Sequence, residues 1–358
     1  MKKIDLLLFI SVVFLGIFGL FMIYDASSFV AFRDFSDKYH YVKEHSFWMI
    51  IGFLSLVFFS NLNYHRLYNL SVPLLIASIL LLILVFIPPF SLKLLGARRW
   101  VDLGFFTIQP SEIVKLTLAI YLSAWFSTKE KGRFIAFLLL ISVVLGLIFL
   151  QPDMGTAVII LVESVAIYFL SGANLLHLFI LTPLALIAAI ILAIAEPYRA
   201  ARIATFLNFN QDIASTSYHV RQILIALGSG GLLGVGLGNS LQKYAYLPEN
   251  ATDSIFAIIA EEIGFVGSVF IISVFILLIW RGFVISQNAR DLFGKLLAGG
   301  ISTFIAAQVL INLSAQTALV PLTGIPLPFI SYGGTALVIN LSSIGILLNI
   351  KKQSHKNI

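Results

Sequence analysis

The chain has 358 residues, of which 59% are hydrophobic and 11% are charged, and 23 Lys and Arg residues against 17 Asp and Glu residues give a net charge of +6. A typical soluble domain has roughly 25% charged residues, so this composition excludes a soluble globular protein and indicates an integral membrane protein. The basic excess is typical of loops that orient helices and contact anionic lipid, and it does not indicate nucleic-acid binding. The chain has no cysteine, which excludes disulfides, thiol catalysis and cysteine-based metal sites.

Apolar segments follow one another along almost the whole chain. A membrane-spanning helix needs about 20 mainly apolar residues, and the sequence predicts ten such helices. Their predicted ranges are 5–26, 46–62, 70–88, 110–126, 134–150, 154–171, 174–195, 254–280, 293–318 and 336–350. The first follows Met1-Lys2-Lys3 but lacks a small-residue cleavage site, so we expect a retained helix and not a signal peptide. The fold class predicted is an all-α polytopic membrane protein, a single domain over residues 1–358.

The distribution of basic residues predicts the orientation. Short loops and tails such as 127–133 and 351–358 are basic, so both termini are expected in the cytoplasm. Three irregular segments then lie on the outer face: 89–109, the large loop 196–253 between helices 7 and 8, and 320–335. Non-helical backbone near a membrane is tolerated where protein buries it or where it lines a cavity. The three segments together predict a cavity on the outer face.

The densest polar cluster lies within Gly234–Gly264, and it contains the strongest candidate for chemistry. Asp253 stands at the start of the eighth predicted helix, where it would act either as a helix N-cap or as a general base that takes a proton from a hydroxyl group. Glu249, four residues earlier, is either a second carboxylate of the site or a loop cap. Spacing alone leaves both pairs of alternatives open.

Ionisable residues inside the predicted helices are few, and each has a structural interpretation. Glu112 and Lys115 are three residues apart on one face of the fourth helix, which favours a buried ion pair, although Lys115 would also suit a phosphate. Glu163 has no partner nearby in the sequence and is expected to be protonated or hydrogen-bonded to another helix. Asp153 begins a helix and is interpreted as its cap.

Cations and an aromatic residue mark the outer segments. The cations are Arg98, Arg99, Arg202, Arg221 and Lys243. Scattered, they would be solvated loop charges, but gathered around a cavity they would bind a pyrophosphate. Trp100 is expected either to stack on a sugar or to sit in the interfacial aromatic belt. Gly230, Gly234 and Gly238 follow no strand, so they are interpreted as close-packing positions and not as a dinucleotide fingerprint.

Four long motifs resemble those of the SEDS (shape, elongation, division and sporulation) peptidoglycan polymerases. They are GARRWVDLGFFTIQPSEIVKL (96–116), QPDMGTA (151–157), GLGNSLQKYAYLPENATDSIFAIIAEEIGFVG (236–267) and GIPLPFISYGGT (324–335). The resemblance extends from the first helix to about residue 350. The GLGNSLQKYAYLPE form is more similar to division-type and sporulation-type members than to elongation-type members. Asp25 is a departure, because relatives often lack an acid there.

The resemblance implies ten helices and an inverting glycosyltransferase that joins lipid II disaccharides into glycan strands on the outer membrane face. It implies that Asp253 is the essential acid, the base for the acceptor sugar hydroxyl. Further residues expected to contact lipid II are Arg99, Trp100, Arg202, Gln242, Lys243 and Glu249. Glu112 and Lys115 match the buried pair of the family. A divalent cation, Mg²⁺ or Mn²⁺, would share the charge of the leaving pyrophosphate, although the sequence shows no dedicated metal site.

The partners implied are lipid II, a class B penicillin-binding transpeptidase, other division proteins and membrane lipid, with no nucleic acid. The location implied is the bacterial cytoplasmic membrane at the division septum. Three alternatives remain: an elongation-type polymerase, a lipid II flippase and a non-enzymatic division scaffold. The sequence shows neither an inverted repeat nor paired broken helices, and this disfavours a transporter.

Overall fold

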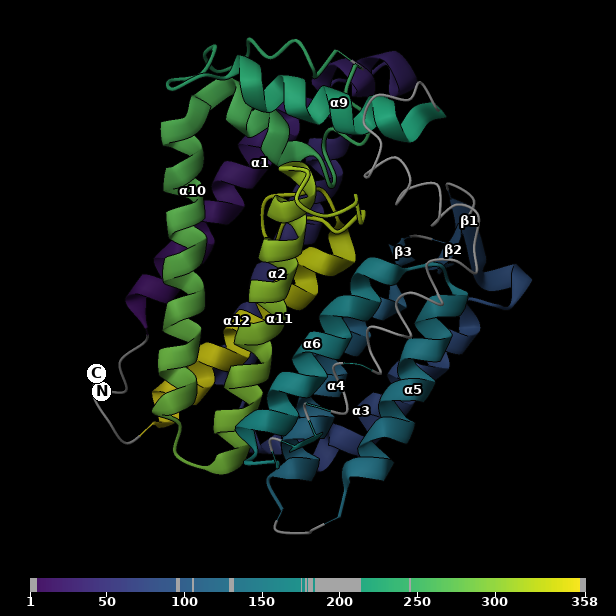
Figure 1. The fold of residues 1–358 in the computed structure, drawn as a ribbon, viewed down its shortest axis with the longest axis vertical. Helices are drawn as coiled ribbons and strands as arrows, with labels where there is room; N and C mark the ends of the chain where they lie inside the picture. The colour runs from purple at the N-terminus through teal and green to yellow at the C-terminus, as the bar shows by residue number, and fades with distance from the viewer. Residues whose placement is uncertain are drawn as a thin grey trace.

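A computed structural model describes residues 5–94, 97–104, 106–128, 132–174, 176–177, 179, 183, 214–244 and 246–354. These residues form ten α-helices and a small three-stranded sheet. The helices are α1 (Leu6–Phe35), α2 (His40–Asn61), α3 (His65–Leu84), α4 (Pro110–Phe126), α5 (Phe134–Leu150), α6 (Met154–Leu170), α9 (Ala214–Ser229), α10 (Ile255–Gln287), α11 (Leu292–Gln316) and α12 (Gly334–Gln353). Figure 1 shows most of them running side by side along the long axis of the molecule.

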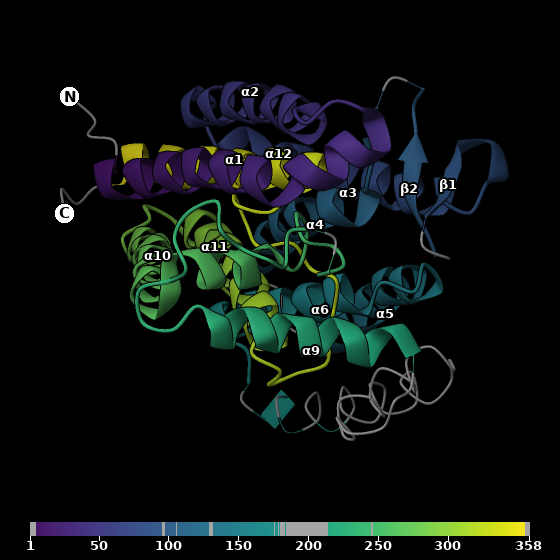
Figure 2. The same cartoon turned by 90° about the horizontal axis from the view of Figure 1, so that it is seen from above.

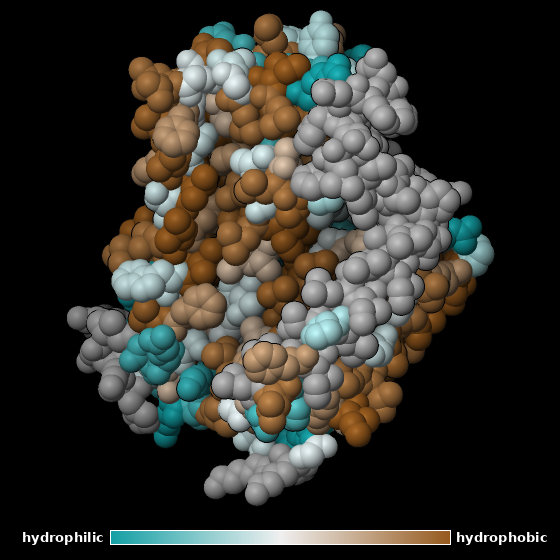
Figure 3. Space-filling model, viewed as in Figure 1, coloured by the Kyte–Doolittle hydropathy of each residue, from teal (hydrophilic) through white to brown (hydrophobic). Residues whose placement is uncertain are grey.

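Nine of the ten predicted spans coincide with helices, which confirms the helical membrane fold. The tenth, 174–195, lies almost entirely outside the described residues. Six of the described helices are long and apolar enough to cross a membrane, and α5 and α6 are shorter apolar helices. Large apolar side chains such as Phe265, Phe270 and Trp280 of α10 are exposed, and the face in Figure 3 is mostly hydrophobic. Such a surface is expected where the solvent is lipid and not water.

The two ends of the helix bundle differ in structure. The start of α1 and the end of α12 lie at the same end (Figure 1), as an even number of spans requires. There Asp5 caps α1, and Arg281 of α10 donates a 2.5 Å hydrogen bond to Asp5 Oδ2. At the opposite end, α9 lies crosswise over the bundle (Figures 1 and 2) and packs against α10 and α11. Because α9 lies across the bundle and not along it, this helix does not correspond to any of the predicted spans.

A small antiparallel sheet follows α3 in one of the three irregular segments predicted for the outer face. Its strands are β1 (Ser91–Leu94), β2 (Ala97–Asp102) and β3 (Thr107–Ile108), preceded by the single 3₁₀ turn Pro88–Phe90. Trp100 pairs with Leu92 across β1 and β2, where a bulge shifts the register by one residue. The all-α prediction missed this sheet, because strands of two to six residues give a weaker periodic signal than long apolar helices do.

The longest helix, α10, is broken at Gly264. Gly264 has φ +69° and ψ −170°, a backbone conformation that essentially only glycine adopts. The interrupted hydrogen bonds are replaced by a loop: Val235 N and Gly236 N donate to Glu261 O and Glu262 O, at 3.0 Å each. In return, Phe265 N donates to Gly231 O at 2.9 Å. The glycines of segment 230–238 therefore allow a loop to pack against a broken helix, and not helix against helix as predicted.

The same break bears on the argument against a transporter. We expected no paired broken helices, and α10 contains one break. The break is buried against protein, as irregular backbone within a membrane protein requires. In the part of the chain that the structure describes, no second long spanning helix contains a comparable interruption, so the paired arrangement typical of transporters is not seen there.

Replacing Gly264 with alanine is expected to destabilise the fold by about 2 kcal/mol or more. The backbone conformation alone is costly for a residue with a Cβ, and the new atom would also press on the backbone of Leu233 and Gly234. Thermal unfolding in detergent would measure the loss. Gly146→Ala in α5 is the matched control, because nothing lies within 4 Å of the added Cβ there. Equal melting temperatures for the two variants would contradict this account of the break.

Candidate active site

Asp253 lies immediately before α10, at the end of the bundle that carries α9. Ser254 and not Asp253 occupies the N-cap position of α10, so the capping explanation for this acid does not hold. The side chain of Asp253 is partly exposed, and its Oδ1 accepts a 3.3 Å hydrogen bond from Thr252 Oγ1. Its Oδ2 lies 3.9 Å from where a Cβ on Gly324 would stand, so the carboxylate faces the GIPLPF segment. A carboxylate with such access is able to accept a proton from a bound hydroxyl group.

The main chain of Asp253 is fixed by two amides that the sequence analysis did not single out. Asn312 Nδ2 and Gln316 Nε2 both donate to the Asp253 carbonyl oxygen, at 3.0 and 2.6 Å. Both amides come from α11 and are buried. The signal that would have found them is their spacing of four residues on one face of an otherwise apolar helix.

The loop before Asp253 is held by contacts to α1 and to the segment before α12. Asn250 Nδ2 donates to Ala26 O of α1 at 3.0 Å, and Tyr332 N donates to Ala251 O at 2.9 Å. Glu249 is exposed, has φ +50°, and its Oε2 accepts a 2.9 Å hydrogen bond from Thr252 Oγ1. Glu249 therefore caps its own turn and also presents a carboxylate to the surface.

Two of the irregular segments predicted for the outer face come together near this loop. Tyr332 joins 320–335 to the loop before Asp253, and its hydroxyl donates a 2.6 Å hydrogen bond to Glu44 Oε2. Gln109 N donates to Thr335 Oγ1 at 3.2 Å, which brings segment 89–109 to the same region. Residues 196–213 of the loop 196–253, and with them Arg202, lie outside the described residues.

Lys243 is not presented to the surface as a pyrophosphate ligand would be. It is 6% exposed, and its ammonium lies 2.9 Å from Asp25 Oδ1 and 3.2 Å from Glu262 Oε1. Burial lowers the pKa of Lys243, but the hydrogen bonds and charges of the two carboxylates outweigh burial and leave the pKa raised. Gln242 is also buried, and its Oε1 has no hydrogen-bond partner in the described part of the chain. Asp25, whose role the sequence left open, is thus the ionic partner of Lys243.

The raised pKa of Lys243 predicts how stability depends on pH. The folded state holds the proton of Lys243 more tightly than the unfolded chain does. The contribution of Lys243 to the free energy of unfolding is therefore complete below about pH 10.4, the ordinary pKa of lysine. It is lost as the pH rises through the folded-state pKa. The gap in melting temperature between the native chain and Lys243→Met should therefore be constant from pH 7 to 9 and narrow above about 10.4. A gap that widens with pH would contradict this assignment.

Arg99 and Trp100 come from β2, and Arg99 is directed at a neighbouring loop. Arg99 Nε donates to Gln151 O at 3.2 Å and Arg99 Nη2 to Pro152 O at 2.5 Å. That loop leads to Asp153, which accepts from Thr156 N and caps α6 as the sequence predicted. The guanidinium of Arg99 therefore ties the sheet to the start of α6, and Trp100 beside it remains partly exposed. The structure does not gather Arg99 and Lys243 into one free cationic cluster.

Glu112 and Lys115 form a fully buried ion pair in α4. Glu112 Oε2 lies 2.7 Å from Lys115 Nζ, and Lys115 also donates to Gln308 Oε1 of α11 at 3.0 Å. The Lys115 side chain has no exposed surface, so it does not reach a phosphate in solution. Glu163 of α6 is also buried, and neither of its carboxylate oxygens has a hydrogen-bond partner among the described residues. Within that part of the chain, the hydrogen-bonded alternative expected for Glu163 is therefore not seen.

Two further features bear on ligands. Among the described residues, no three His, Asp or Glu side chains are grouped to hold a metal ion, so the donors seen here do not by themselves fit a divalent cation.

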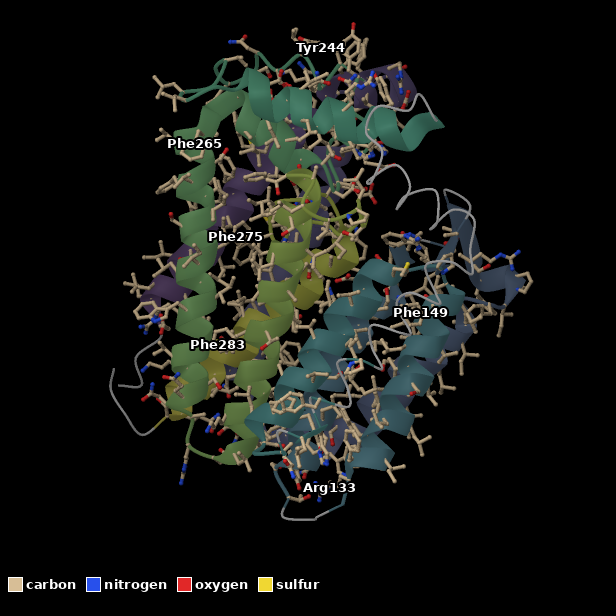
Figure 4. The ribbon with its side chains drawn as sticks, in the orientation of Figure 1. Arg133, Phe149, Tyr244, Phe265, Phe275 and Phe283 are labelled. Carbon is tan, nitrogen blue, oxygen red and sulfur yellow. The ribbon has the colours of Figure 1, made fainter. Side chains whose placement is uncertain are left out.

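A groove of about 440 Å³ runs along α2 and is lined by Leu20, Ser46, Met49, Ile50, Phe53, Leu54 and Val57. Its lining is almost wholly apolar, and none of these residues belongs to the loop that carries Asp253. Figure 4 shows Tyr244 at the end where α9 lies, far from Arg133 at the other end.

Comparisons with known proteins point to one family. The model for FtsW, RodA and SpoVE, described as a cell cycle protein, matches residues 5–356. Stage V sporulation protein E of Bacillus subtilis (strain 168) is 38% identical over 356 residues, covering 98% of this chain and 97% of the relative. The probable peptidoglycan glycosyltransferase FtsW of Trichlorobacter lovleyi is 36% identical, covering 98% of this chain and 93% of the relative.

Solved structures agree with the sequence comparisons. A chain from "Structural coordination of polymerization and crosslinking by a peptidoglycan synthase complex" matches with a TM-score of 0.82 and 27% identity, over 99% of both chains. The rod shape determining protein RodA of Thermus thermophilus matches with a TM-score of 0.73 and 27% identity, also over 99% of both chains.

Proposed function

From the membership of this chain in the FtsW, RodA and SpoVE family, we propose that it polymerises lipid II into glycan strands, with Asp253 as the catalytic base. The chain is a multi-pass membrane protein and a peptidoglycan glycosyltransferase of the SEDS type. The observation that carries the residue assignment is the placement of Asp253. Its main chain is clamped by two buried amides, and its partly exposed carboxylate faces the GIPLPF segment.

In the proposed reaction, C1 of the donor sugar is transferred from an oxygen of the lipid pyrophosphate to the 4-oxygen of the acceptor sugar. The Asp253 carboxylate takes the proton from the 4-hydroxyl of the acceptor sugar as this oxygen attacks C1 of the donor sugar. The bond between C1 and the lipid pyrophosphate breaks, the new glycosidic bond forms with inversion at C1, and the pyrophosphate leaves with the electron pair. Asp253 releases its proton to water before the next cycle. This reaction needs only one carboxylate, the base, because the leaving pyrophosphate needs no general acid.

Some of the residues expected to contact the pyrophosphate and the sugars keep that proposed role, and others receive a different one. Arg202, Trp100 and Glu249 remain proposed lipid II contacts, since Trp100 and Glu249 are accessible. Arg99 would serve as a contact only by leaving the carbonyls of Gln151 and Pro152. Lys243 is committed to Asp25 and Glu262, so we assign it, with the adjacent Gln242, to holding the loop that bears Asp253.

We place the chain with the division or sporulation branch, at the septum, with both termini in the cytoplasm. The relatives at 36–38% identity carry the names FtsW and SpoVE, whereas the RodA structure is 27% identical, and this supports the placement over the elongation branch. A class B penicillin-binding transpeptidase is the proposed partner, because the matching chain of known structure belongs to a complex of polymerization and crosslinking.

The test is synthesis of glycan strands from lipid II by the purified chain in proteoliposomes, with and without the transpeptidase. Strands in either condition support the polymerase. Transfer of labelled lipid II across the vesicle without polymer would favour the flippase alternative. Assembly with the partner without product in either condition would favour the scaffold.

A further inference from the structure

Three buried amides follow one another on one face of α11. Gln308, Asn312 and Gln316 are spaced four residues apart and are 0%, 2% and 2% exposed. We call these three residues the amide ladder. Burying an amide without hydrogen bonds costs about 1–3 kcal/mol in proteins, so three in one apolar helix require partners. The identity of those partners shows what the amide ladder does.

Two amides of the ladder, Asn312 and Gln316, hold the main chain of Asp253, the candidate base. Gln316 Nε2 donates to Asp253 O and, at 3.1 Å, to Asn312 Oδ1. Asn312 Nδ2 donates to Asp253 O and, at 2.7 Å, to Ile325 O. Asn312 therefore ties the residue that carries the carboxylate to the segment that the carboxylate faces.

The lowest amide joins that segment to the intramembrane ion pair. Gln308 Nε2 donates to Pro326 O at 2.9 Å, and Gln308 Oε1 accepts from Lys115 Nζ at 3.0 Å. An ammonium has only donors, so it holds the amide oxygen of Gln308 and directs the amide nitrogen toward Pro326. Glu112, 2.7 Å from Lys115, neutralises the buried charge. The pair in α4 thus sets the orientation of the first amide.

We propose that the amide ladder, oriented at its base by Lys115 and Glu112, positions the Asp253 carboxylate against segment 323–327. This inference rests on the proposed function and deepens it. It gives the buried ion pair a role in the active site without contact between Lys115 and substrate. The members are positioning residues, because each acts on Asp253 only through hydrogen bonds. Displacing a catalytic group by about 1 Å costs about 100-fold in rate, so loss of the central amide should be costly for turnover.

The first experiment separates positioning from general stability. Asn312→Leu removes the central amide at similar volume, and Asn349→Leu in α12 is its matched control. Asn349 is also a buried asparagine, with Nδ2 donating to Ser60 O at 2.9 Å and Oδ1 accepting from Tyr64 N at 3.0 Å. Both variants are expected to lower the melting temperature in detergent. Only Asn312→Leu should also lower kcat for lipid II polymerisation, by about 10- to 100-fold, with KM changed less than about threefold.

A milder variant keeps the test informative if Asn312→Leu does not fold. Gln316→Met removes one of the two donors to Asp253 O and leaves the bond from Asn312 in place. It should lower kcat by about 10-fold with KM unchanged. Full kcat in both folded variants, or equal losses of kcat in Asn312→Leu and Asn349→Leu, would overturn the proposal.

The second experiment asks whether the ion pair acts through Gln308. The charge-neutral variant Glu112→Gln/Lys115→Met and the variant Gln308→Leu are compared with their combination. If the pair works through Gln308, the combined loss of kcat should not exceed the larger single loss by more than about twofold. If the two losses of kcat multiply in the combined variant, the ion pair and Gln308 act independently. That result would contradict the proposal that the pair acts through Gln308.

Failure of the inference and failure of the proposed function give different results. If the native chain polymerises lipid II, Asp253→Asn does not, and Asn312→Leu keeps the native kcat, only the amide ladder proposal is wrong. If Asp253→Asn polymerises at the native rate, the catalytic assignment itself is wrong.

Discussion

Asp253→Asn is expected to lower the rate of lipid II polymerisation by about 10²- to 10⁴-fold, the usual contribution of a general base. Asparagine keeps the size of the side chain but accepts no proton at neutral pH. The hydrogen bonds from Asn312 and Gln316 go to the main-chain carbonyl, so the substitution leaves them in place. The fold should therefore survive while the chemistry is lost. The measurement is the initial rate of strand synthesis by purified protein, normalised to the amount of folded protein.

The control for this prediction is an exposed carboxylate beyond the end of α1. Asp37 pairs with Lys43 at 2.7 Å, and this contact holds the pKa of Asp37 below its ordinary value. Among the described residues its hydrogen bonds go to Tyr39 N and Lys43 and not to the loop that carries Asp253, so Asp37→Asn should polymerise at the native rate. Native activity in Asp253→Asn would end the assignment of this residue as base. A loss in Asp37→Asn as large as that in Asp253→Asn would show that the assay reports surface charge.

Lys243→Met is expected to destabilise the folded chain by about 3–5 kcal/mol, the usual cost of removing one partner from a buried ionic group. The variant leaves Asp25 and Glu262 buried without the cation that both contact. Because these two residues lie on α1 and α10, the damage should spread to the packing of both helices. Thermal or denaturant unfolding in detergent, followed by intrinsic fluorescence, would measure the loss.

A charge-neutral variant provides the check on this second prediction. Lys243→Met combined with Asp25→Asn and Glu262→Gln removes the unpaired charges, and it should recover most of the stability that the single variant loses. If Lys243→Met is as stable as the native chain, the ion pairs contribute nothing. If the triple variant is less stable than the single variant, the carboxylates contribute through contacts other than Lys243.

The sequence predicted the spans well and their lengths less well. Apolar runs located nine helices, because a membrane demands a continuous apolar surface of fixed depth. The helices extend beyond that depth: α1 continues to Phe35 and not to residue 26, and α10 continues to Gln287 and not to residue 280. Hydrophobicity reports where lipid ends, whereas hydrogen bonding decides where a helix ends.

The candidate site was predictable only in part. The motif around Asp253 indicated a candidate acid, which stays a prediction, but nothing in the order of residues indicated that Asp25 would meet Lys243. These two residues are far apart in the chain, and their contact depends on how α1 and the loop after α9 pack. The same limit applies to Lys115 and Gln308. The spacing of polar residues in α11 carried a readable signal, since three amides at four-residue intervals on an apolar helix need a common set of partners.

The interruption of α10 at Gly264 separates the part of the helix that follows Asp253 from the part that crosses most of the membrane. Spanning helices adjust their tilt when bilayer thickness changes. In α10 the loop 231–236 is hydrogen-bonded on both sides of the break, because Val235 N and Gly236 N donate to Glu261 O and Glu262 O before Gly264 and Phe265 N donates to Gly231 O after it. A change in the tilt of the long part of α10 is therefore expected to reach the turn after Asp253 through this loop as well as through the helix itself.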